Sequence, residues 1–375
     1  MKPAIYLDHN ATSPVRPEAA DAVAAALMLT GNPSSAHGFG RQVRKLMEDA
    51  REKVAALAEA SAGGVIFTSG GTEANDLALN GAGRRRVLVS AVEHPAVLDA
   101  RADAEIIPVD GNGVVDLQAL DDMLAASEEP ALVSIMAANN ETGVIQPVAI
   151  AADIAHARGA LFHTDAVQAA GKIPIGLKTF GADMLTLTAH KMGGPMGVGA
   201  LVHADGVSVG PRVLGGGQER RRRAGTENVS GIAGFGAVVE TALQNRHSND
   251  MAILRDGLEV RVKQAAPEAV IIGENADRLP NTSCIALPGV SSQTQVMTLD
   301  LVGFAVSSGS ACSSGKVSPS HVLKAMALSD DLASSFIRIS LGWTNTQEDL
   351  ELFVEAWNGL RVETAANGIS VAPAA

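Results

Sequence analysis

The chain has 375 residues, of which 46% are hydrophobic, 19% are charged and 3% are aromatic, and it carries two cysteines. So few cysteines exclude a disulfide framework, the lack of a CxxC pair excludes a thiolate zinc site, and the apolar fraction excludes a disordered protein. The formal net charge of −12 opposes general nucleic-acid binding and favours a soluble protein.

The chain shows no signal for a membrane or for export. No apolar run approaches the roughly 18 to 20 residues that span a bilayer. The first residues, MKPAIYLDHNATSPV, lack the basic and apolar regions of a signal peptide. We therefore expect a cytoplasmic protein that does not contact a membrane.

The first two thirds of the chain alternate short apolar runs with longer amphipathic ones. Continuous runs of Val, Ile and Leu separated by helices are typical of parallel strands that are buried on both faces. We predict an α/β fold here, with helices on both faces of a mainly parallel sheet. The expected strands are 65–68, 87–90, 131–136, 161–164, 184–188 and 198–202, and the expected helices are 41–60, 72–80, 148–158 and 229–244.

The pattern changes after Asn245. A charged helix at 250–265 is followed by strand-like VIIGE, SCIALPG and IRISLG, with helices between them. This mixture predicts a smaller α+β domain. We predict a large domain over 15–245 and a small domain formed by 1–14 and 246–375.

Several strand ends carry residues suited to chemistry. In VIFTSGGTEANDLAL, a glycine turn precedes a helix that begins at Thr72, and the free amides of such a helix start favour an anion such as phosphate. A plain capped turn is the alternative. Asp165 ends another strand in HTDAVQ, where α/β sheets bind ligands, although an aspartate helix cap would give the same pattern.

A lysine, a histidine and an asparagine pair follow three further strands. Lys191 stands beside small residues in TAHKMGG; a desolvated lysine becomes a nucleophile for carbonyls, whereas a lysine reaching solvent is the alternative. His94 precedes Pro95, which suits the first position of a helix. Asn139 and Asn140 end the strand in IMAANNETG.

The two cysteines have different surroundings. Cys312 lies in the Ser/Gly-rich loop SSGSACSS before a helix, which suits a mobile nucleophile better than a core position, although an incidental surface thiol is the alternative. Cys284 lies in strand-like NTSCIALPG and is predicted to be a small buried apolar residue.

The chain resembles the NifS/IscS-type cysteine desulfurases, which are class-V aminotransferase-like enzymes with the fold-type-I pyridoxal-phosphate architecture. The resemblance covers essentially the whole chain. It rests on the segments YLDHNATSPV, FTSGGTEAN, EHPAVL, NNETGVIQP, HTDAVQAAGK, TAHKMGGPMGVGAL, GGGQERRRRAGTEN, SSGSACSS and IRISLG, which occur in the family's order.

The resemblance implies pyridoxal 5'-phosphate as the cofactor. Lys191 would bind its aldehyde covalently, Asp165 its ring nitrogen and Gln168 its ring hydroxyl, while His94 would stack on the ring and transfer protons. The remaining implied contacts are Gly71, Thr72, Thr188 and His190 at the phosphate, Asn140 beside the ring and the substrate, and Thr226, which would reach the phosphate in the partner subunit of a homodimer.

The implied reaction converts L-cysteine to L-alanine. Arg338 would bind the substrate carboxylate, and Cys312 would accept the sulfur as a persulfide and pass it to an acceptor or scaffold protein. Three destinations for the sulfur stay open: iron–sulfur cluster assembly, nitrogenase maturation and tRNA thiolation. We therefore expect a link to iron–sulfur metal centres, but no metal site in the protein itself. Direct nucleic-acid binding is not expected, and the arginine run 220–223 is expected to serve the dimer and the mouth of the site.

Two alternatives stay open. One is a selenocysteine lyase or another class-V pyridoxal-phosphate aminotransferase or lyase; the other is a non-catalytic scaffold, which the joint presence of Lys191, Asp165 and His94 opposes. The sequence also departs from the family. Many relatives continue GRFT after the carboxylate-binding arginine, whereas this chain reads Gly342-Trp343-Thr344-Asn345.

Overall fold

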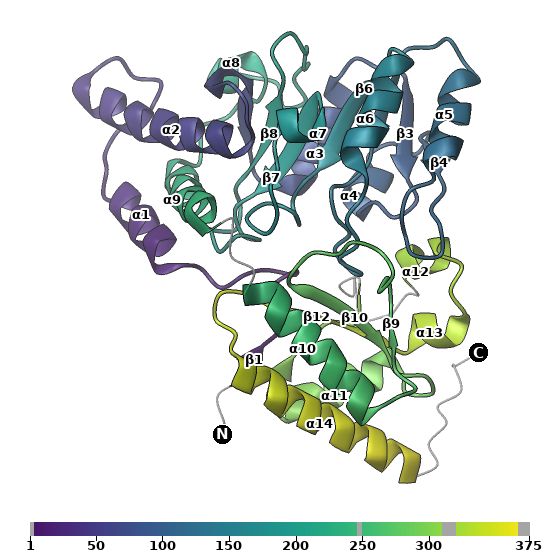
Figure 1. The fold of residues 1–375 in the computed structure, drawn as a ribbon. Coiled ribbons are helices and arrows are strands. Elements are labelled where there is room, and N and C mark those ends of the chain that lie inside the picture. Colours follow the sequence, from purple (N-terminus) through teal and green to yellow (C-terminus); the bar gives the residue numbers. More distant parts are fainter. Residues whose placement is uncertain (1–3, 246–249, 310–319, 367–375) are drawn as a thin grey trace.

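A seven-stranded sheet forms the centre of the computed structural model, which describes residues 4–245, 250–309 and 320–366 (Figure 1). The strand order is β2-β8-β7-β6-β5-β3-β4. Every residue of β2, β5, β7 and β8 is buried, as expected for a sheet covered on both faces. The strands are β2 (Val65–Thr68), β3 (Arg86–Ser90), β4 (Glu105–Ile107), β5 (Ala131–Ser134), β6 (Leu161–Asp165), β7 (Met184–Thr188) and β8 (Gly199–His203).

One strand of this sheet runs against the others. β8 is antiparallel to both β2 and β7, whereas β3, β4, β5, β6 and β7 pair in parallel. The apolar run at 198–202 was predicted as a strand without a direction of its own, and the structure shows it to be antiparallel to both neighbours. No helix lies between β7 and β8, and a parallel return would need a longer crossover, so the chain simply reverses. The prediction of a mainly parallel α/β sheet is confirmed.

Helices cover both faces of the sheet, because alternate residues of each strand point to opposite sides. Phe67 and Val133 belong to the core that α2, α5, α6 and α9 complete, whereas their neighbours Ile66 and Leu132 belong to the core beneath α3. The helices of this part are α1 (Pro17–Leu27), α2 (Gly38–Leu57), α3 (Gly71–Gly81), α4 (Pro95–Leu98), α5 (Leu117–Ala125), α6 (Val148–Ala157), α7 (Leu177–Phe180), α8 (Gln218–Arg221) and α9 (Val229–Asn245), with a 3-10 turn at Ala62–Gly64.

The C-terminal third builds a second layer below the large sheet (Figure 1). A three-stranded antiparallel sheet has the order β12-β10-β9, and β1 pairs with β11 in parallel. Trp357 and Phe353 fill its core. The elements are β1 (Ile5–Tyr6), α10 (Asp250–Ala265), β9 (Val270–Ile271), β10 (Thr282–Ala286), α11 (Ser292–Leu301), β11 (Phe304–Ala305), α12 (His321–Ala325), α13 (Asp330–Ser334), β12 (Phe336–Ser340) and α14 (Gln347–Ala366).

The N-terminal segment connects the two layers. His9 N donates to Ser340 O at 3.1 Å in the lower layer, whereas Ser13 N donates to His190 O at 2.9 Å in the upper one. Residues 1–14 were assigned to the small domain, and their segment hydrogen-bonds to both layers. The division at 15–245 stays a prediction.

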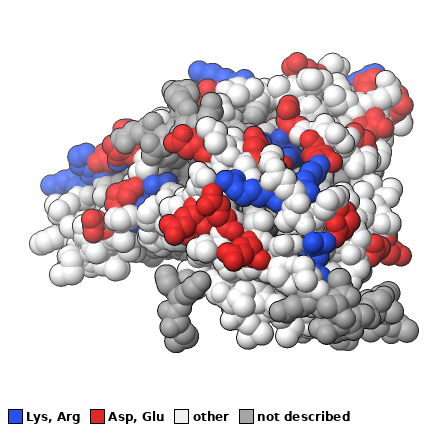
Figure 2. Space-filling view, turned by 60° about the horizontal axis from the view of Figure 1, so that its bottom comes forward, with Lys and Arg blue, Asp and Glu red and all other residues white. Residues whose placement is uncertain are grey.

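The surface carries charges of both signs. On the face turned forward in Figure 2, Lys and Arg lie among Asp and Glu and form no large patch of one sign. Ion pairs between Arg261 and Glu351 at 3.0 Å and between Arg361 and Glu268 at 2.9 Å involve α10 and α14. Among the described residues, no helix is long and apolar enough to cross a membrane.

Candidate active site

The carboxyl ends of the parallel strands surround a cavity of about 510 Å³. This is the edge of an α/β sheet at which ligands bind. Residues from β12 and from the N-terminal segment close the cavity from the lower layer. Ten of the residues predicted from the sequence line it: Gly71, Thr72, His94, Asn140, Asp165, Gln168, Thr188, His190, Lys191 and Arg338.

Lys191 follows β7 and holds its amine against backbone carbonyls. Its Nζ donates to Asn10 O at 2.5 Å and to Ala11 O at 2.7 Å. No described carboxylate forms an ion pair with it. Burial, reinforced by the charge of Arg338, lowers the pKa of Lys191 to about 8. The amine is therefore far closer to its neutral, nucleophilic form at physiological pH than an ordinary lysine.

Asp165 ends β6 and is held by two hydrogen bonds. Its Oδ1 accepts from Val167 N at 2.9 Å, and its Oδ2 accepts from Asn75 Nδ2 at 2.7 Å. Both side chains are buried. The two hydrogen bonds fix the orientation of the carboxylate, so Asp165 is positioned to accept from a protonated ring nitrogen. Asn75 lies in the quoted TEAN segment, but its role was missed because its partner is distant in the sequence.

A glycine turn leads from β2 into α3 and leaves backbone amides facing the cavity. Gly199 of β8 lies directly behind it: a Cβ there would be 2.7 Å from the Gly70 carbonyl carbon and 2.8 Å from Leu187 O. Only glycine permits this close approach. Glu73 fixes the turn by accepting from Ser69 N at 2.8 Å and from Arg223 Nε at 2.8 Å.

His94 caps α4, and its hydrogen bond defines its tautomer. Nδ1 accepts from Ala96 N at 3.0 Å, so Nε2 carries the proton in the neutral ring. Burial is the main cause that lowers the pKa of His94. A second histidine, His321, lines the same cavity and donates through Nε2 to Glu93 O at 2.8 Å. Because a carbonyl only accepts, His321 also carries a proton on Nε2, as His94 does in its neutral form.

Arg338 enters the cavity from β12. Nη2 donates to Asp8 Oδ1 at 2.6 Å and Nη1 donates to Asn140 O at 3.0 Å. Its Nε is buried and has no hydrogen-bond partner among the described residues. A buried guanidinium donor left without an acceptor is costly, which favours an anion at this position.

These residues fit pyridoxal 5'-phosphate. The aldehyde requires an amine such as Lys191, the ring nitrogen a carboxylate such as Asp165, and the phosphate the amides that begin α3 with the Thr188 hydroxyl nearby. The Oδ1 atom of Asn75 is buried and has no hydrogen-bond partner in the part of the chain that the structure describes, so the wall retains an acceptor for a ligand. The described residues contain no cluster of three or more His, Cys, Asp or Glu side chains able to hold a metal ion.

The sequence matches the aminotransferase class-V family model over residues 5–353. The chain belongs to this family. A cysteine desulfurase of Cereibacter sphaeroides is 45% identical over 366 residues, which cover 94% of this chain and 94% of that protein. A NifS-like protein from Rickettsia africae ESF-5 has a TM-score of 0.89 at 37% identity, covering 96% of this chain and 99% of that one. SspA, solved in complex with cysteine, has a TM-score of 0.79 at 27% identity, covering 90% and 98%.

The comparisons confirm the resemblance to NifS/IscS-type members of the class-V family and the fold-type-I architecture. They say nothing about individual site residues, whose roles stay predictions.

Two of the predicted site residues are not in the described cavity. Thr226 is exposed and lines a smaller cavity of about 150 Å³ with Ser69 and Arg223. Cys312 lies outside the described residues.

The other cysteine and the arginine run have defined surroundings. Cys284 is buried beside Phe336 and Ala286, and burial raises the pKa of its thiol, so it is a packing residue. Within the arginine run, Arg223 contacts Glu73 at the glycine turn, and Arg222 Nη1 donates to Gly63 O at 3.1 Å.

Sequence reasoning missed the polar residues that support the site from outside the strand ends. Asn10 accepts from Lys191 and from Gln168 Nε2, the latter at 2.9 Å through its carbonyl. Lys172 Nζ donates to Asn10 Oδ1 at 2.8 Å. The segments YLDHNATSPV and HTDAVQAAGK contain these residues, and a polar side chain within each quoted segment was the only available signal.

Proposed function

We propose that the protein is a pyridoxal-phosphate-dependent cysteine desulfurase that converts L-cysteine to L-alanine and transfers the sulfur to Cys312. The observation that carries the proposal is one cavity lined by the Lys191 amine, the Asp165 carboxylate and the Arg338 guanidinium. The relatives named cysteine desulfurase and the bound cysteine of SspA support the choice of substrate.

The cofactor would be held at three points. Lys191 would hold its aldehyde, Asp165 and Gln168 its ring, and the start of α3 with Thr188 and His190 its phosphate. When bound, pyridoxal phosphate supplies an electron sink for negative charge at the substrate α-carbon. Burial lowers the pKa of His190 to about 4, so that its ring stays neutral and can donate one hydrogen bond at neutral pH.

Arg338 would bind the substrate carboxylate. Its fork of donors matches two carboxylate oxygens, and the unpartnered Nε supplies a donor that no described residue uses. Asp8 holds Nη2, which fixes the guanidinium plane before the substrate arrives. Asn140 presents its backbone oxygen to Nη1 from the opposite side.

His94 would move the protons. Its Nδ1 is already occupied by Ala96 N, so any exchange with the substrate passes through Nε2. A lowered pKa keeps the ring neutral at physiological pH, so Nε2 presents its proton to the substrate, and Nε2 can accept a proton only after its own has been given up or moved to Nδ1. His94 therefore serves as a positioned carrier rather than as a permanent cation.

Cys312 would accept the sulfur. Its thiolate attacks the substrate sulfur, the bond from that sulfur to the substrate β-carbon breaks, and the electron pair returns to carbon, which gains a proton and leaves as alanine. The sulfur remains on Cys312 as a persulfide for an acceptor protein. A homodimer would bring Thr226 of one subunit to the phosphate of the other.

The proposal is tested with the reconstituted holoprotein. L-cysteine should yield alanine at a rate that Lys191→Ala abolishes, whereas L-serine should yield none. Selenocysteine is the second substrate to measure, because the same site fits selenium. A holoprotein that binds the cofactor but forms alanine only from selenocysteine would contradict the proposed activity and support a selenocysteine lyase.

A further inference from the structure

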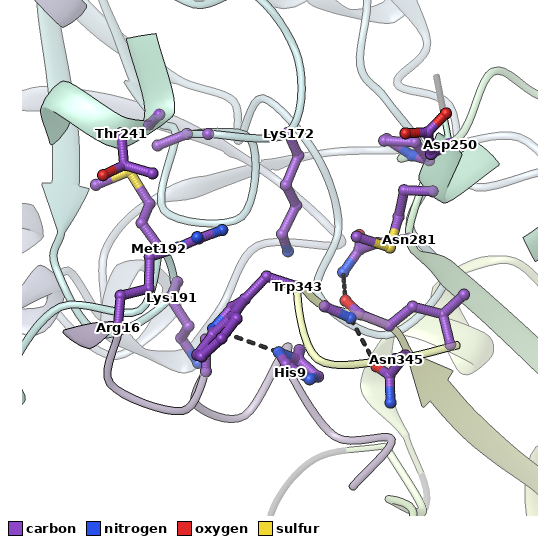
Figure 3. A pocket seen from close by; sticks show the side chains of 18 of the residues that line it. His9, Arg16, Lys172, Lys191, Met192, Thr241, Asp250, Asn281, Trp343 and Asn345 are labelled. Atoms are coloured by element: carbon purple, nitrogen blue, oxygen red, sulfur yellow. Dashed lines mark hydrogen bonds between the residues drawn. The ribbon is translucent and has the colours of Figure 1, made fainter. Parts of the chain in front are cut away.

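A second cavity of about 390 Å³ lies next to the proposed cofactor site and shares only Lys191 with it (Figure 3). Its volume is within the range of about 300 to 1,000 Å³ in which small-molecule pockets fall. Nothing in the proposed reaction uses it. Its walls come from the N-terminal segment, from the loop after β6, from α9 and α10, and from the turn that follows β12.

Arg16 supplies an unpaired positive charge to this cavity. Its guanidinium carbon lies 5.1 Å from the centroid of the Trp343 ring, and Figure 3 shows the side chain reaching into the cavity. Within the described ranges it forms no ion pair or side-chain hydrogen bond, although buried arginines such as Arg51 and Arg278 each bind a glutamate. Burial lowers the pKa of Arg16, because its charged guanidinium is less well solvated here than in water.

Lys172 supplies an amine from the facing wall (Figure 3). Burial, with the charges of Lys191 and Arg338, lowers the pKa of Lys172 well below that of an ordinary lysine, and an anion bound in the cavity would favour its charged form. Its Nζ donates to Asn10 Oδ1 at 2.8 Å and to Gln168 Oε1 at 3.0 Å, and both acceptors are neutral amides. An ammonium has three donors, so one is left for a ligand. The Arg16 guanidinium and the Lys172 amine face one cavity without a described carboxylate in contact, and together they favour an anion there, even though the whole chain has a net charge of −12.

The rest of the lining narrows the ligand class. Asp250 lies on the far wall from Arg16, so the positive charge is confined to one side of the cavity, which suits a ligand with a single carboxylate (Figure 3). Met192, Leu254 and Trp343 offer apolar surface. Burial lowers the pKa of His9 to about 4, so that ring adds no positive charge at neutral pH.

We propose that this cavity binds a small organic monocarboxylate, with the carboxylate between Arg16 and Lys172 and the carbon chain against Trp343 and Leu254. A carboxylate matches the planar donor fork of an arginine better than a spherical anion does. The site is separate from the proposed substrate site at Arg338, and its occupancy is measured without turnover.

Hexanoate is the probe, and Trp343 is the reporter. The chain has two tryptophans; Trp343 is 39% exposed at the cavity, whereas Trp357 is fully buried in the core of the lower layer. Hexanoate should change the fluorescence of the holoprotein saturably, and Trp343→Phe should remove the change. 1-Hexanol, which has the same chain without the charge, should bind at least about tenfold more weakly.

One variant and one control test whether Arg16 binds the carboxylate of hexanoate. Arg16→Gln should weaken hexanoate binding about tenfold or more, while Arg212→Gln, which alters an exposed arginine paired with Asp76, should leave it unchanged. Equal binding of hexanoate and 1-hexanol by the unaltered protein would overturn the proposal without depending on any variant. So would a lack of saturable binding, or binding of inorganic sulfate as tight as that of hexanoate.

Discussion

Asn75 Nδ2 donates a 2.7 Å hydrogen bond to Asp165 Oδ2, and both side chains are buried. The pair joins the first turns of α3, which begins at the proposed phosphate site, to the strand end that carries the carboxylate for the ring nitrogen. One amide therefore sets the position of two contacts that the cofactor would make.

Replacing Asn75 by Ala should weaken pyridoxal-phosphate binding. Asp165 would keep only its bond from Val167 N, and loss of a buried hydrogen bond to a charged group costs about 1.5 to 3 kcal/mol, or roughly tenfold or more in affinity. A spectrophotometric titration of the apoprotein measures this. Asn80→Ala removes a similar bond to Asp76 at the other end of α3 and should leave the affinity unchanged. Equal effects of the two variants would contradict the role of Asn75.

The uptake of pyridoxal phosphate by the apoprotein should depend on pH through Lys191. Burial, with the charge of Arg338, lowers the pKa of this lysine from 10.5 to about 8. Protonation removes the nucleophilic lone pair, so the rate should rise with pH and reach half its maximum near pH 8. A free lysine analogue should instead have its midpoint near about 10.4. A midpoint for the protein close to that of the analogue would show that the lysine is not desolvated.

Arg338→Gln should raise the KM for L-cysteine more than it lowers kcat. The variant removes the fork of donors proposed for the substrate carboxylate, and such a loss costs about 2 to 3 kcal/mol, or a factor of about 30 to 160. Steady-state alanine formation gives both constants. Arg338→Lys should recover part of the loss, because it keeps the charge without the fork. A large fall in kcat at an unaltered KM would argue against carboxylate binding.

The stability of the large sheet should depend on a buried ion pair. Arg51 Nη1 and Nη2 contact Glu219 Oε2 and Oε1 at 2.8 and 2.9 Å, and Phe67 N donates to the same carboxylate at 2.9 Å. Glu219→Ala leaves Arg51 charged and unpaired, so unfolding should become easier by about 3 to 5 kcal/mol. Denaturant unfolding measures the change.

An exposed pair provides the control for this prediction. Lys45 Nζ and Asp49 Oδ2 lie 2.7 Å apart on the surface of α2, where water screens the ion pair and it adds little to stability. Asp49→Ala should therefore barely shift the unfolding midpoint. Similar shifts for Glu219→Ala and Asp49→Ala would show that the buried pair does not stabilise the fold in this way.

The sequence predicted the strands of the large sheet well where they are continuously apolar. β2 and β7 begin and end at the predicted residues, because both faces of these strands are buried and turn residues follow them. β4 was missed: it is a short edge strand, and Ile106 is exposed on its outer side. The direction of β8 depends on the connection before it rather than on its own composition, so its apolar run did not reveal it.

The site was predictable where a motif ends a strand. Lys191 and Asp165 follow apolar runs, and the topology of a parallel sheet then brings them to one edge. Asn10 and Lys172 were not predicted, because their hydrogen bonds join residues far apart in the chain. The pattern of residues within one segment does not indicate which distant residue it will contact.

The transfer of sulfur to Cys312 is the central claim, and a single-turnover experiment tests it most directly. One equivalent of L-cysteine is added to the holoprotein, to Cys312→Ala and to Cys284→Ala, and mass spectrometry locates any added sulfur. The account predicts a mass increase of one sulfur on Cys312 in the unaltered protein and in Cys284→Ala, together with alanine, and no such adduct in Cys312→Ala. Persulfide on Cys284, or an undiminished yield of alanine and sulfide from Cys312→Ala, would contradict it.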